Sequence, residues 1–523
     1  MNRLEKALEG NRVFLLLHPF AFAAFSVVFL FVENRSDVQV SDTFLPFVFV
    51  LLLAACAYAL FYLSLASLPK AAVIASGFIL AFQSFGHIVS YFQSSPIYPL
   101  KYCLLSVNLA VLSLSHVFLK KTNSDVRTLN LFLSVVSFTL VSVNIISILP
   151  ETVHQADNLS NRSIVNSGEL PYGRPDIYYI ILDAYPREDT LRQILGFDNS
   201  GFLRGLEARG FHVANMSKSN YPTTYLSLAS SLNMMYLDSV TKAVGGRPLC
   251  GNFKDRAIPY RMIRNSEVVS DLKSRGYTFI NLRSGWGPTD DMTTADLELG
   301  PPHSGRDTEF FKLFFKTSAL CLISDFVVVD FSVLRKDIEY SFDTLGEIPD
   351  IKGPTFTLAH IMSPHPPLLF NSAGEPVQDE VYLGWGYYGS DSKAKFVDQV
   401  IYINRRVEGA IDEILNKSHE PPVIIIQADH GTWFRDRMIS ICMNYSALYR
   451  LSQQEMMERM GILNAYYLPD GEGAGLYDSI TPVNSFRLVL NHYFAENRTL
   501  LDDRSYFSCW NVCPYEFREV NDG

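Results

Sequence analysis

The sequence predicts an N-terminal α-helical transmembrane bundle of five spans, followed by an α/β domain whose mostly parallel central sheet is covered by helices on both faces. Nearly all long apolar runs of the 523-residue chain lie before residue 150, and each is close to the ~20 residues that a bilayer requires. Beyond residue 175, short runs of β-branched and aromatic residues alternate with segments of helical periodicity. Such alternation is typical of a doubly wound, mostly parallel sheet.

The apolar runs divide the chain into three segments. Residues 1–150 form the predicted transmembrane domain, 151–174 a polar linker rich in Asn and Ser, and 175–523 the α/β domain. The first run is too long, and too soon followed by others, to be a cleaved signal peptide. The predicted spans are residues 12–33, 43–68, 71–92, 100–119 and 128–149.

The loops between the predicted spans differ in positive charge, which predicts the orientation of the bundle. Short cytoplasmic loops carry an excess of Lys and Arg. Seven such residues fall in segments that we place on the cytoplasmic side of the membrane, and two in segments that we place on the outer side. The N-terminus is therefore predicted to be cytoplasmic, with the α/β domain on the other side. The inner residues are Arg3, Lys6, Arg12, Lys70, Lys120, Lys121 and Arg127, and the outer ones are Arg35 and Lys101.

Composition argues against one class of partner and favours one covalent link. The formal net charge is −10, and the sequence has no basic stripe with interleaved aromatic residues, which argues against nucleic-acid binding. Of the seven cysteines, Cys56 and Cys103 fall in predicted spans. Cys509 and Cys513 are close enough in sequence to be the favoured disulfide, if the compartment is oxidising.

The α/β domain is predicted to begin with an apolar strand at 177–182, which ends at Asp183. Gly210 closes the second of two early helices, because glycine is favoured just beyond a helix C-terminus. A loop around Trp286 could rim a site at the end of the strand before it, or could simply be exposed. The other predicted strands are 211–214, 277–282, 355–361 and one from 423, and the predicted helices are 189–196, 199–209, about 266–275 and 393–416.

The buried strand that begins at residue 423 ends abruptly in Asp429, His430 and Gly431. In open α/β sheets, ligands bind just beyond the carboxyl ends of the strands, which is where these residues stand. Adjacent oxygen and nitrogen ligands suit a divalent metal such as zinc or manganese. The alternative is an acidic turn after a core strand, with no ligand.

A second element could act together with such a metal. Residues 219–233 begin with turn residues and Pro222, then continue as a helix of small residues. Proline is favoured in the first helical turn, so Thr223 and Thr224 are expected at the helix N-terminus, where free N–H groups favour an anion. A metal-bound hydroxyl there could ionise and attack phosphorus. The alternative is N-capping by the hydroxyl, which needs no catalysis.

The order of these polar residues along the chain resembles a known family. The sequence is similar to the alkaline phosphatase/sulfatase superfamily. With five spans before an outward-facing sulfatase-like domain, it resembles the lipoteichoic acid synthases and the lipid A phosphoethanolamine transferases of bacterial envelopes. The similarity covers the whole architecture, whereas the matching motifs are confined to residues 175–435. The matched residues are Asp183, Thr224, His360, His365 and Asp429-His430-Gly431.

The resemblance implies a role for each matched residue. Thr224 would be the catalytic nucleophile, beside one divalent metal ion, which could be zinc, manganese or calcium. Two histidines would contact the phosphate of the substrate or a second metal, and two nearby residues are added as anion contacts on proximity alone, with an exposed loop as their alternative. The predicted metal ligands are Asp183, Thr224, Asp429 and His430. The predicted substrate-binding residues are His360, His365, Lys218 and Asn220.

Departures from the family narrow this assignment. Sulfatases carry Cys or Ser followed by x-Pro-x-Arg, so that the nucleophile can be oxidised to formylglycine, whereas Thr224 is followed by Tyr225. Threonine cannot become that aldehyde, which disfavours sulfate-ester hydrolysis. The related transferases usually carry Glu in place of Asp183, and a further histidine where this chain has Thr432 and Trp433. One tightly held metal is therefore expected.

The function predicted from this resemblance is metal-dependent transfer of a phosphoethanolamine- or phosphoglycerol-like group through a phospho-threonine intermediate. The donor would be a membrane phospholipid and the acceptor an envelope glycan or lipid. The protein would be a multi-pass protein of the bacterial inner (plasma) membrane, with a cytoplasmic N-terminus and a periplasmic or extracellular catalytic domain. Two alternatives stay open. One is a hydrolase of phosphodiesters or phosphate esters (sulfate esters being less favoured), and the other is a non-catalytic envelope protein.

Overall fold

The computed structural model separates the chain into two compact units, each described here by itself. One unit comprises Met1–Arg162 and His303–Val329, and the other Ser163–Pro302 and Asp330–Gly523. Most of the predicted linker lies outside the described residues. The residues described are 14–34, 38, 40–92, 100–122, 125–153, 173–238, 240, 256–301, 309–323, 331–377, 392–434, 450–469, 471–510 and 513–520.

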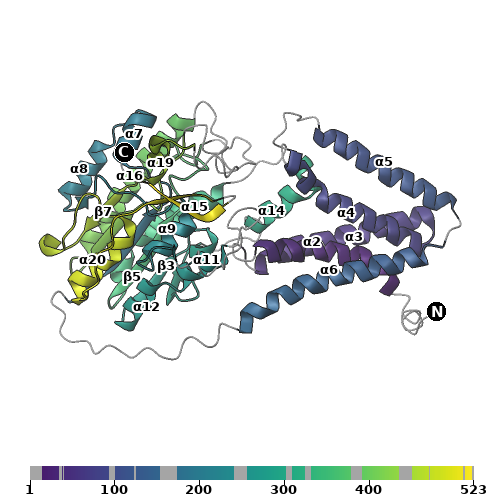
Figure 1. Ribbon diagram of the computed structural model, residues 1–523, viewed down its shortest axis with the longest axis horizontal. Coiled ribbons are helices and arrows are strands. Elements are labelled where there is room, and N and C mark those ends of the chain that lie inside the picture. The colour runs from purple at the N-terminus through teal and green to yellow at the C-terminus, as the bar shows by residue number, and fades with distance from the viewer. Residues whose placement is uncertain are drawn as a thin grey trace. The chain divides into compact units, whose positions relative to one another are not determined.

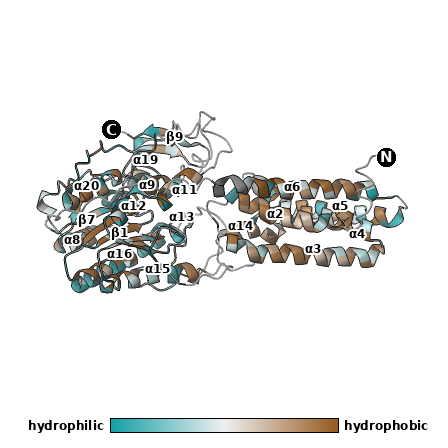
Figure 2. Ribbon diagram, turned by 90° about the horizontal axis from the view of Figure 1, so that it is seen from below, coloured by the Kyte–Doolittle hydropathy of each residue, from teal (hydrophilic) through white to brown (hydrophobic). Residues whose placement is uncertain are grey.

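The first unit is built on apolar helices at the five positions predicted for spans (Figure 1). Figure 2 shows hydrophobic residues along most of their length. Among the described residues, four helices are long and apolar enough to cross a membrane, whereas the first is shorter, with 17 residues. At 1.5 Å per residue, 17 residues span about 25 Å, so a fifth crossing stays a prediction. The helices are α2 (His18–Asn34), α3 (Phe44–Leu65), α4 (Leu68–Phe92), α5 (Leu100–Lys121) and α6 (Arg127–Val153), with short 3₁₀ turns η1 (Phe14–Leu16) and η2 (Val40–Thr43).

A buried histidine links three of these helices. His18 of α2 is fully buried; its Nδ1 lies 2.6 Å from Ser76 Oγ in α4, and its Nε2 lies 2.9 Å from Asn130 Oδ1 in α6. The Asn130 Nδ2 group donates to the carbonyls of Pro69 and Val126. Because the amide nitrogen is used there, the oxygen faces the imidazole, and Nε2 carries the donated proton. Both ring nitrogens therefore serve the packing of the bundle.

A helix from the middle of the sequence completes the first unit. Helix α14 (Glu309–Thr317) packs Phe310 and Phe314 into the same apolar cluster as residues of α2, α3 and α4. Gly86 of α4 lies directly against its last turn, where an added Cβ would stand only 2.5 Å from the carbonyl carbon of Thr317 and closer still to another backbone oxygen. This helix lies outside the elements predicted from the sequence. The 3₁₀ turn η3 (Ala319–Leu322) follows it.

The second unit is built around a sheet in which seven described strands run in the order β2-β7-β6-β1-β5-β3-β4. The central strand β1 (Ile177–Leu182) pairs in parallel with both β5 (Thr355–Ile361) and β6 (Val423–Gln427). Only the β7 edge runs antiparallel among these pairings. The sheet is therefore mostly parallel, as predicted. The remaining strands are β2 (His212–Val213), β3 (Thr278–Leu282), β4 (Leu297–Leu299) and β7 (Asn464–Tyr467).

Alternate residues of β1 enter two apolar clusters, one on each side of the sheet. Ile177, Tyr179 and Ile181 pack with residues of α9, α11, α12 and α20, and Tyr178 and Ile180 pack with residues of α7, α8, α15 and α16 (Figure 2). The helices are α7 (Glu188–Leu195), α8 (Ser200–Ala208), α9 (Thr224–Ser231), α11 (Ala257–Arg264), α12 (Glu267–Ser274), α13 (Gly287–Asp290), α15 (Ser332–Leu345), α16 (Ser392–Lys417), α19 (Gln453–Met460) and α20 (Pro482–Phe494), with 3₁₀ turns η5 (Ile348–Asp350) and η6 (Gly471–Gly473).

The predicted Cys509–Cys513 disulfide is wrong. Cys513 is disulfide-bonded, but Cys509 is not its partner, although the two residues face each other across the hairpin of β8 (Tyr506–Cys509) and β9 (Cys513–Glu519). Cys509 is instead buried in a small apolar cluster with Phe507 and Trp510. A cysteine in such surroundings packs as a small hydrophobic residue.

Candidate metal and active site

Two neighbouring strands bring three of the predicted metal ligands together. Asp183 follows β1, and Asp429 and His430 follow β6, which is paired with β1. One ligand atom from each of these three side chains lies within 4.8 Å of the others, and all three residues are buried. The parallel order of the strands is the cause, since their carboxyl ends meet at one edge of the sheet.

The Asp429 carboxylate is oriented by two backbone donors. Its Oδ1 accepts the N–H of Ala184 at 3.0 Å and its own neighbour's N–H, that of His430, at 2.9 Å. Ala184 has φ 60°, a left-handed conformation that costs a non-glycine residue roughly 1–2 kcal/mol. This turn aims the Ala184 N–H at Asp429. The second oxygen, Oδ2, is left for the cluster.

The His430 ring is also held in one orientation. Its Nδ1 lies 3.0 Å from the carbonyl of Gly431, and because a carbonyl can only accept, Nδ1 carries the proton. Nε2 is then the unprotonated nitrogen, 3.3 Å from Asp429 Oδ2 and 3.7 Å from Asp183 Oδ1. Such an arrangement, with Nδ1–H bonded to the backbone, is the usual one for a metal-binding imidazole.

Three buried atoms at this edge have no hydrogen-bond partner within the described part of the chain: Asp183 Oδ1, Asp429 Oδ2 and His360 Nε2. Buried polar atoms in native proteins are nearly always satisfied. Two carboxylate oxygens and the bare imidazole nitrogen of His430 form a donor set that suits zinc or manganese. The residues therefore fit a divalent cation.

Burial and the close pair of carboxylates shape the protonation of this cluster. Burial, together with the neighbouring Asp183, raises the pKa of Asp429 to about 6. Burial acts in the same direction on Asp183, but the imidazoles of His365, His360 and His430 outweigh it and hold its pKa below the ordinary value. Burial, and then the nearby Arg459 cation, lowers the pKa of His430 well below its usual value. A neutral imidazole beside two acids favours a bound cation.

Thr224 is the first residue of α9, and its hydroxyl points at the cluster. Its Oγ1 lies 3.4 Å from His430 Nε2, the ring nitrogen that also faces Asp183 and Asp429. Thr223, the N-cap residue, makes no side-chain capping bond. The N-capping alternative therefore does not explain either threonine. Thr224 is only partly buried, whereas its neighbours on α9 are buried, so its hydroxyl is accessible from outside.

The two predicted substrate-binding histidines both lie close to Asp183. His360 lies within β5, and its Nε2 is 3.6 Å from Asp183 Oδ2. The other ring nitrogen, Nδ1, lies 2.8 Å from Thr289 Oγ1, and the ring meets Trp286 edge-on at 5.5 Å. The Trp286 loop thus rims the site. Sequence reasoning missed Thr289, because a lone threonine in a short helix gives no signal.

His365 approaches the cluster through its backbone. Its N–H donates to the carbonyl of Asp183 at 3.0 Å, and its ring centroid lies 6.2 Å from that of His430. Its Nδ1 lies 2.6 Å from the carbonyl of Pro366. By the same reasoning as for His430, Nε2 is the nitrogen that is available to a ligand.

The two residues added on proximity are buried rather than part of an exposed loop. The Asn220 amide bonds the backbone on both sides: Oδ1 accepts the N–H of Val483 and Nδ2 donates to the carbonyl of Arg504, each at 2.8 Å. The backbone of Lys218 forms a β-bridge with Gly461. These contacts connect the segment before Thr224 to its surroundings, so we assign Asn220 a structural role.

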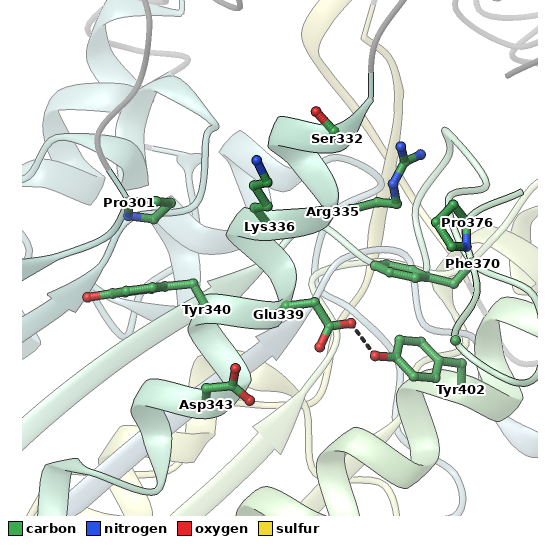
Figure 3. Close-up of a pocket in the computed structure, with 11 residues that line it drawn as sticks. Pro301, Ser332, Arg335, Lys336, Glu339, Tyr340, Asp343, Phe370, Pro376 and Tyr402 are labelled. Carbon is green, nitrogen blue, oxygen red and sulfur yellow. Dashed lines mark hydrogen bonds between the residues drawn. The ribbon is translucent and has the colours of Figure 1, made fainter.

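A separate hollow of about 670 Å³ lies along α15 (Figure 3). Its acids are already engaged: Glu339 accepts a hydrogen bond from Tyr402, as the figure shows, and Asp343 pairs with Arg406 at 2.5 Å. None of the sequence-predicted site residues lines it. The unsatisfied polar atoms at the sheet edge, rather than this hollow, mark the candidate site.

The sequence matches no protein-family model and no curated protein. The structure is similar to the C-terminal periplasmic domain of EptC from Escherichia coli, with 11% identity over 67% of this chain and 92% of that one, and a TM-score of 0.41. It is similar to the integral membrane protein lipooligosaccharide phosphoethanolamine transferase A from Neisseria meningitidis, with 10% identity over 92% and 95%, and a TM-score of 0.38. The yidJ protein from Bacteroides fragilis gives 13% identity over 66% of this chain and 84% of that one, and a TM-score of 0.38. Because these identities and TM-scores are low, the similarities do not assign a function to this chain. A functional assignment therefore depends on the geometry of the site itself.

Proposed function

We propose that the protein is a metal-dependent phosphotransferase of the membrane, which moves a phospho-substituent from a phospholipid to an envelope glycan or lipid. One observation carries the proposal. A partly exposed threonine hydroxyl, on Thr224, lies 3.4 Å from the Nε2 atom of His430, which belongs to a buried cluster with Asp183 and Asp429. A hydroxyl at a helix N-terminus, beside a cation site, is an arrangement suited to nucleophilic attack on phosphorus.

In this proposal Asp183, Asp429, His430 and the Thr224 hydroxyl hold one divalent cation. When bound, such a cation lowers the pKa of the hydroxyl and neutralises charge on phosphoryl oxygens. The Thr224 Oγ1 atom lies 3.4 Å from His430 Nε2, which directs the hydroxyl toward the proposed cation site. The Thr224 oxygen would attack phosphorus and lose its proton to solvent, while the bond from phosphorus to the diacylglycerol oxygen breaks and that oxygen takes up a proton. An acceptor hydroxyl would then attack the same phosphorus and lose its proton, the bond to Thr224 would break, and the threonine hydroxyl would be restored.

The remaining residues of the site would bind the phosphate. The free N–H groups in the first turn of α9 favour an anion at the position that Thr224 attacks. His365, whose Nε2 faces away from its Pro366 bond, and His360, whose Nε2 is buried beside Asp183, would contact phosphoryl oxygens or a second metal. Lys218, which is buried close to this turn, would add positive charge.

The apolar helices support a lipid donor. Four of them are long and apolar enough to cross a membrane, and we propose that all five do so, in a bacterial inner membrane with the N-terminus inside and the catalytic unit outside. Both the donor lipid and the enzyme would then be confined to one surface. Confinement raises the effective concentration of the donor at the site.

Intact mass spectrometry of the full chain in detergent tests this function. The protein is incubated with zinc or manganese and vesicles of phosphatidylethanolamine and phosphatidylglycerol. We expect a covalent gain equal to one phosphoethanolamine or phosphoglycerol group on the wild type and on Thr224→Ser, and none on Thr224→Ala. Thr223→Val, which removes the neighbouring hydroxyl, is the matched control and should keep the adduct.

The same experiment separates the alternatives. Release of the free phospho-headgroup without an acceptor, dependent on Thr224, would identify a hydrolase with water as acceptor. Absence of adduct, of headgroup release and of bound metal would contradict the proposed function and leave the non-catalytic envelope protein. The full chain is needed because residues 303–329 belong to the unit of the apolar helices.

A further inference from the structure

A buried arginine joins the two loops that carry Thr224 and His430. Arg459, on α19, is only 3% exposed. Its Nε donates to the carbonyl of Pro222 at 2.6 Å, and its Nη1 donates to the carbonyl of Gly431 at 2.8 Å. Pro222 stands two residues before the nucleophile, and Gly431 directly follows the metal ligand. One guanidinium group therefore spans both loops.

Two tryptophans fix the plane of this guanidinium group. Its carbon lies 4.1 Å from the ring centroid of Trp433 and 5.2 Å from that of Trp510. The two rings are stacked, with centroids 5.1 Å apart and planes 12° from parallel. A cation over an aromatic face is attracted by the ring, more strongly where water is excluded. The arginine fork is thus held in one orientation toward both carbonyls.

The backbone around Arg459 is equally close to the metal-ligand loop. The N–H of Gly431 donates to the carbonyl of Arg459 at 2.6 Å. A Cβ on Gly431 would stand 2.7 Å from the carbonyl oxygen of Gly461 and 3.0 Å from that of Arg459, so a larger residue could not lie there without moving the loop. The end of α19 and the His430 loop therefore form one closely packed block.

The same block holds the nucleophile loop. The N–H of Ser219 donates to the carbonyl of Met460 at 2.7 Å, and the Lys218 backbone pairs with Gly461. The hydrogen bond from Arg459 to Pro222 is the last of these contacts before α9 begins. Arginine suits this position because its planar fork can donate in two directions at once, whereas the single ammonium of lysine cannot keep both bonds with the same geometry.

We propose that Arg459 is a positioning residue, which sets the separation between the Thr224 hydroxyl and the His430 imidazole. This inference rests on the proposed function, because it assigns Arg459 to the geometry of that site. Arg459 itself would touch neither the substrate nor the metal. It acts through two carbonyl groups, and the Trp433–Trp510 pair keeps it in place.

The test compares Arg459→Met and Arg459→Lys with the wild type, in the full chain. Zinc affinity is measured by competition with a chromogenic chelator, and turnover by release of nitrophenol from bis(4-nitrophenyl) phosphate. Replacing a residue that orients a metal ligand, without touching the metal, typically costs about 10–100-fold in metal affinity or activity. We expect losses of that size in both variants. Turnover should stay low at saturating zinc, with KM within about threefold of the wild type, because Thr224 is misplaced rather than the substrate unbound.

The matched control is Arg504→Met, an arginine whose side chain is 48% exposed and pairs with Asp502 on the surface; it should change none of these values. Near-ultraviolet circular dichroism of the metal-free protein adds a readout that needs no activity, since loss of Arg459 should alter the signal of the stacked tryptophans. A purely structural role would lower thermal stability but leave zinc affinity, and turnover per folded molecule, unchanged.

Zinc affinity and turnover within about threefold of the wild type in folded Arg459→Lys and Arg459→Met would overturn the inference. An inactive wild type would contradict the proposed function instead, while the zinc and dichroism measurements would still decide the role of Arg459. If Arg459→Met does not fold, Arg459→Lys, which keeps the charge and most of the volume, carries the comparison.

Discussion

Both units of the protein bury a histidine among polar groups, but with opposite results. In the bundle of apolar helices, His18 uses both ring nitrogens, toward Ser76 and Asn130. At the edge of the sheet, His360 uses Nδ1 on Thr289 and leaves Nε2 buried without a partner in the described part of the chain. The first histidine is part of the packing, whereas the second faces an incomplete site.

The difference has an energetic meaning. Leaving a buried polar atom unsatisfied costs roughly 1–3 kcal/mol of folding free energy. The unpartnered atoms of Asp183, Asp429 and His360 therefore destabilise the fold, and packing gives no reason for them. A bound cation and substrate would supply the missing contacts. Full satisfaction, as at His18, identifies a structural polar group, and unsatisfied atoms that converge on one point identify a candidate for function.

Neutral isosteres at the two carboxylates should give the largest effect. Asp183→Asn and Asp429→Asn each remove a proposed charged ligand. We expect zinc affinity to fall by more than the ~100-fold that is typical when a residue orienting a ligand is replaced.

In the metal-free protein at pH 7.5, the two substitutions should shift Tm in opposite directions. The pKa of Asp429 is raised by burial and by Asp183, so its ionised form is disfavoured on folding, and Asp429→Asn should raise Tm. The pKa of Asp183 is lowered by the surrounding histidines, so its ionised form is favoured on folding. Asp183→Asn should therefore lower Tm.

Calorimetry with zinc, and thermal unfolding in a chelator, check both halves of this expectation. Equal Tm shifts of the same sign would show that the carboxylates are not the unequal pair that their surroundings indicate. Near-native zinc binding by either variant would remove that residue from the metal site.

A single methyl group should disturb the bundle, where the packing is already complete. The Cβ of Gly86→Ala would stand 2.5 Å from the carbonyl carbon of Thr317 in α14, and overpacking of this kind costs roughly 1–3 kcal/mol. Gly77→Ala, on the same helix, is the control, because its Cβ would meet only a Leu112 side-chain atom at 3.7 Å. We expect lower thermal stability, and faster proteolysis near α14, for Gly86→Ala alone. Equal behaviour of the two variants would show that α14 does not dock against α4.

Much of the fold could be predicted because the signals are local. The strand at 177–182 matches β1, and the helix predicted at 393–416 differs from α16 (Ser392–Lys417) by one residue at each end. Parallel strands end at one edge of a sheet, so Asp183 and Asp429 can both be expected at that edge, and the structure adds that their strands are neighbours. By contrast, α14 was missed. It packs against Gly86, which lies more than two hundred residues earlier, and no local sequence signal reveals a contact over that distance.

The supporting residues of the site were also beyond sequence reasoning. Arg459 is one arginine in an eight-residue helix, and Thr289 lies in a four-residue one. Neither has a neighbour at a characteristic spacing, so only the fold shows that they contact the carbonyl of Gly431 and the ring of His360. Polar residues at strand ends can be proposed as a site from the pattern, whereas the residues that orient them cannot.

The pH dependence of metal binding gives the smallest expected effect, and follows from the same unequal carboxylates. A metal ligand must be deprotonated, so protons compete with zinc below the ligand's pKa. Asp183 stays ionised, because its pKa is lowered, and His430 stays neutral, because its pKa is well below the usual value. Asp429, with a pKa raised to about 6, is therefore the group that takes up a proton as the pH falls through that value.

Apparent zinc affinity should be constant from pH 8 to 7 and fall by at most about tenfold per pH unit below 6, which corresponds to one competing proton. Titration calorimetry in buffers of different ionisation enthalpy measures the protons released: close to none at pH 8, and approaching one at pH 5. A steeper fall, with nearly two protons released, would mean that a second ligand titrates and that the two acids are less unequal than their neighbours make them. If almost no protons are released at either pH, Asp429 is ionised throughout this range. Burial and Asp183 would then not raise its pKa to the value expected.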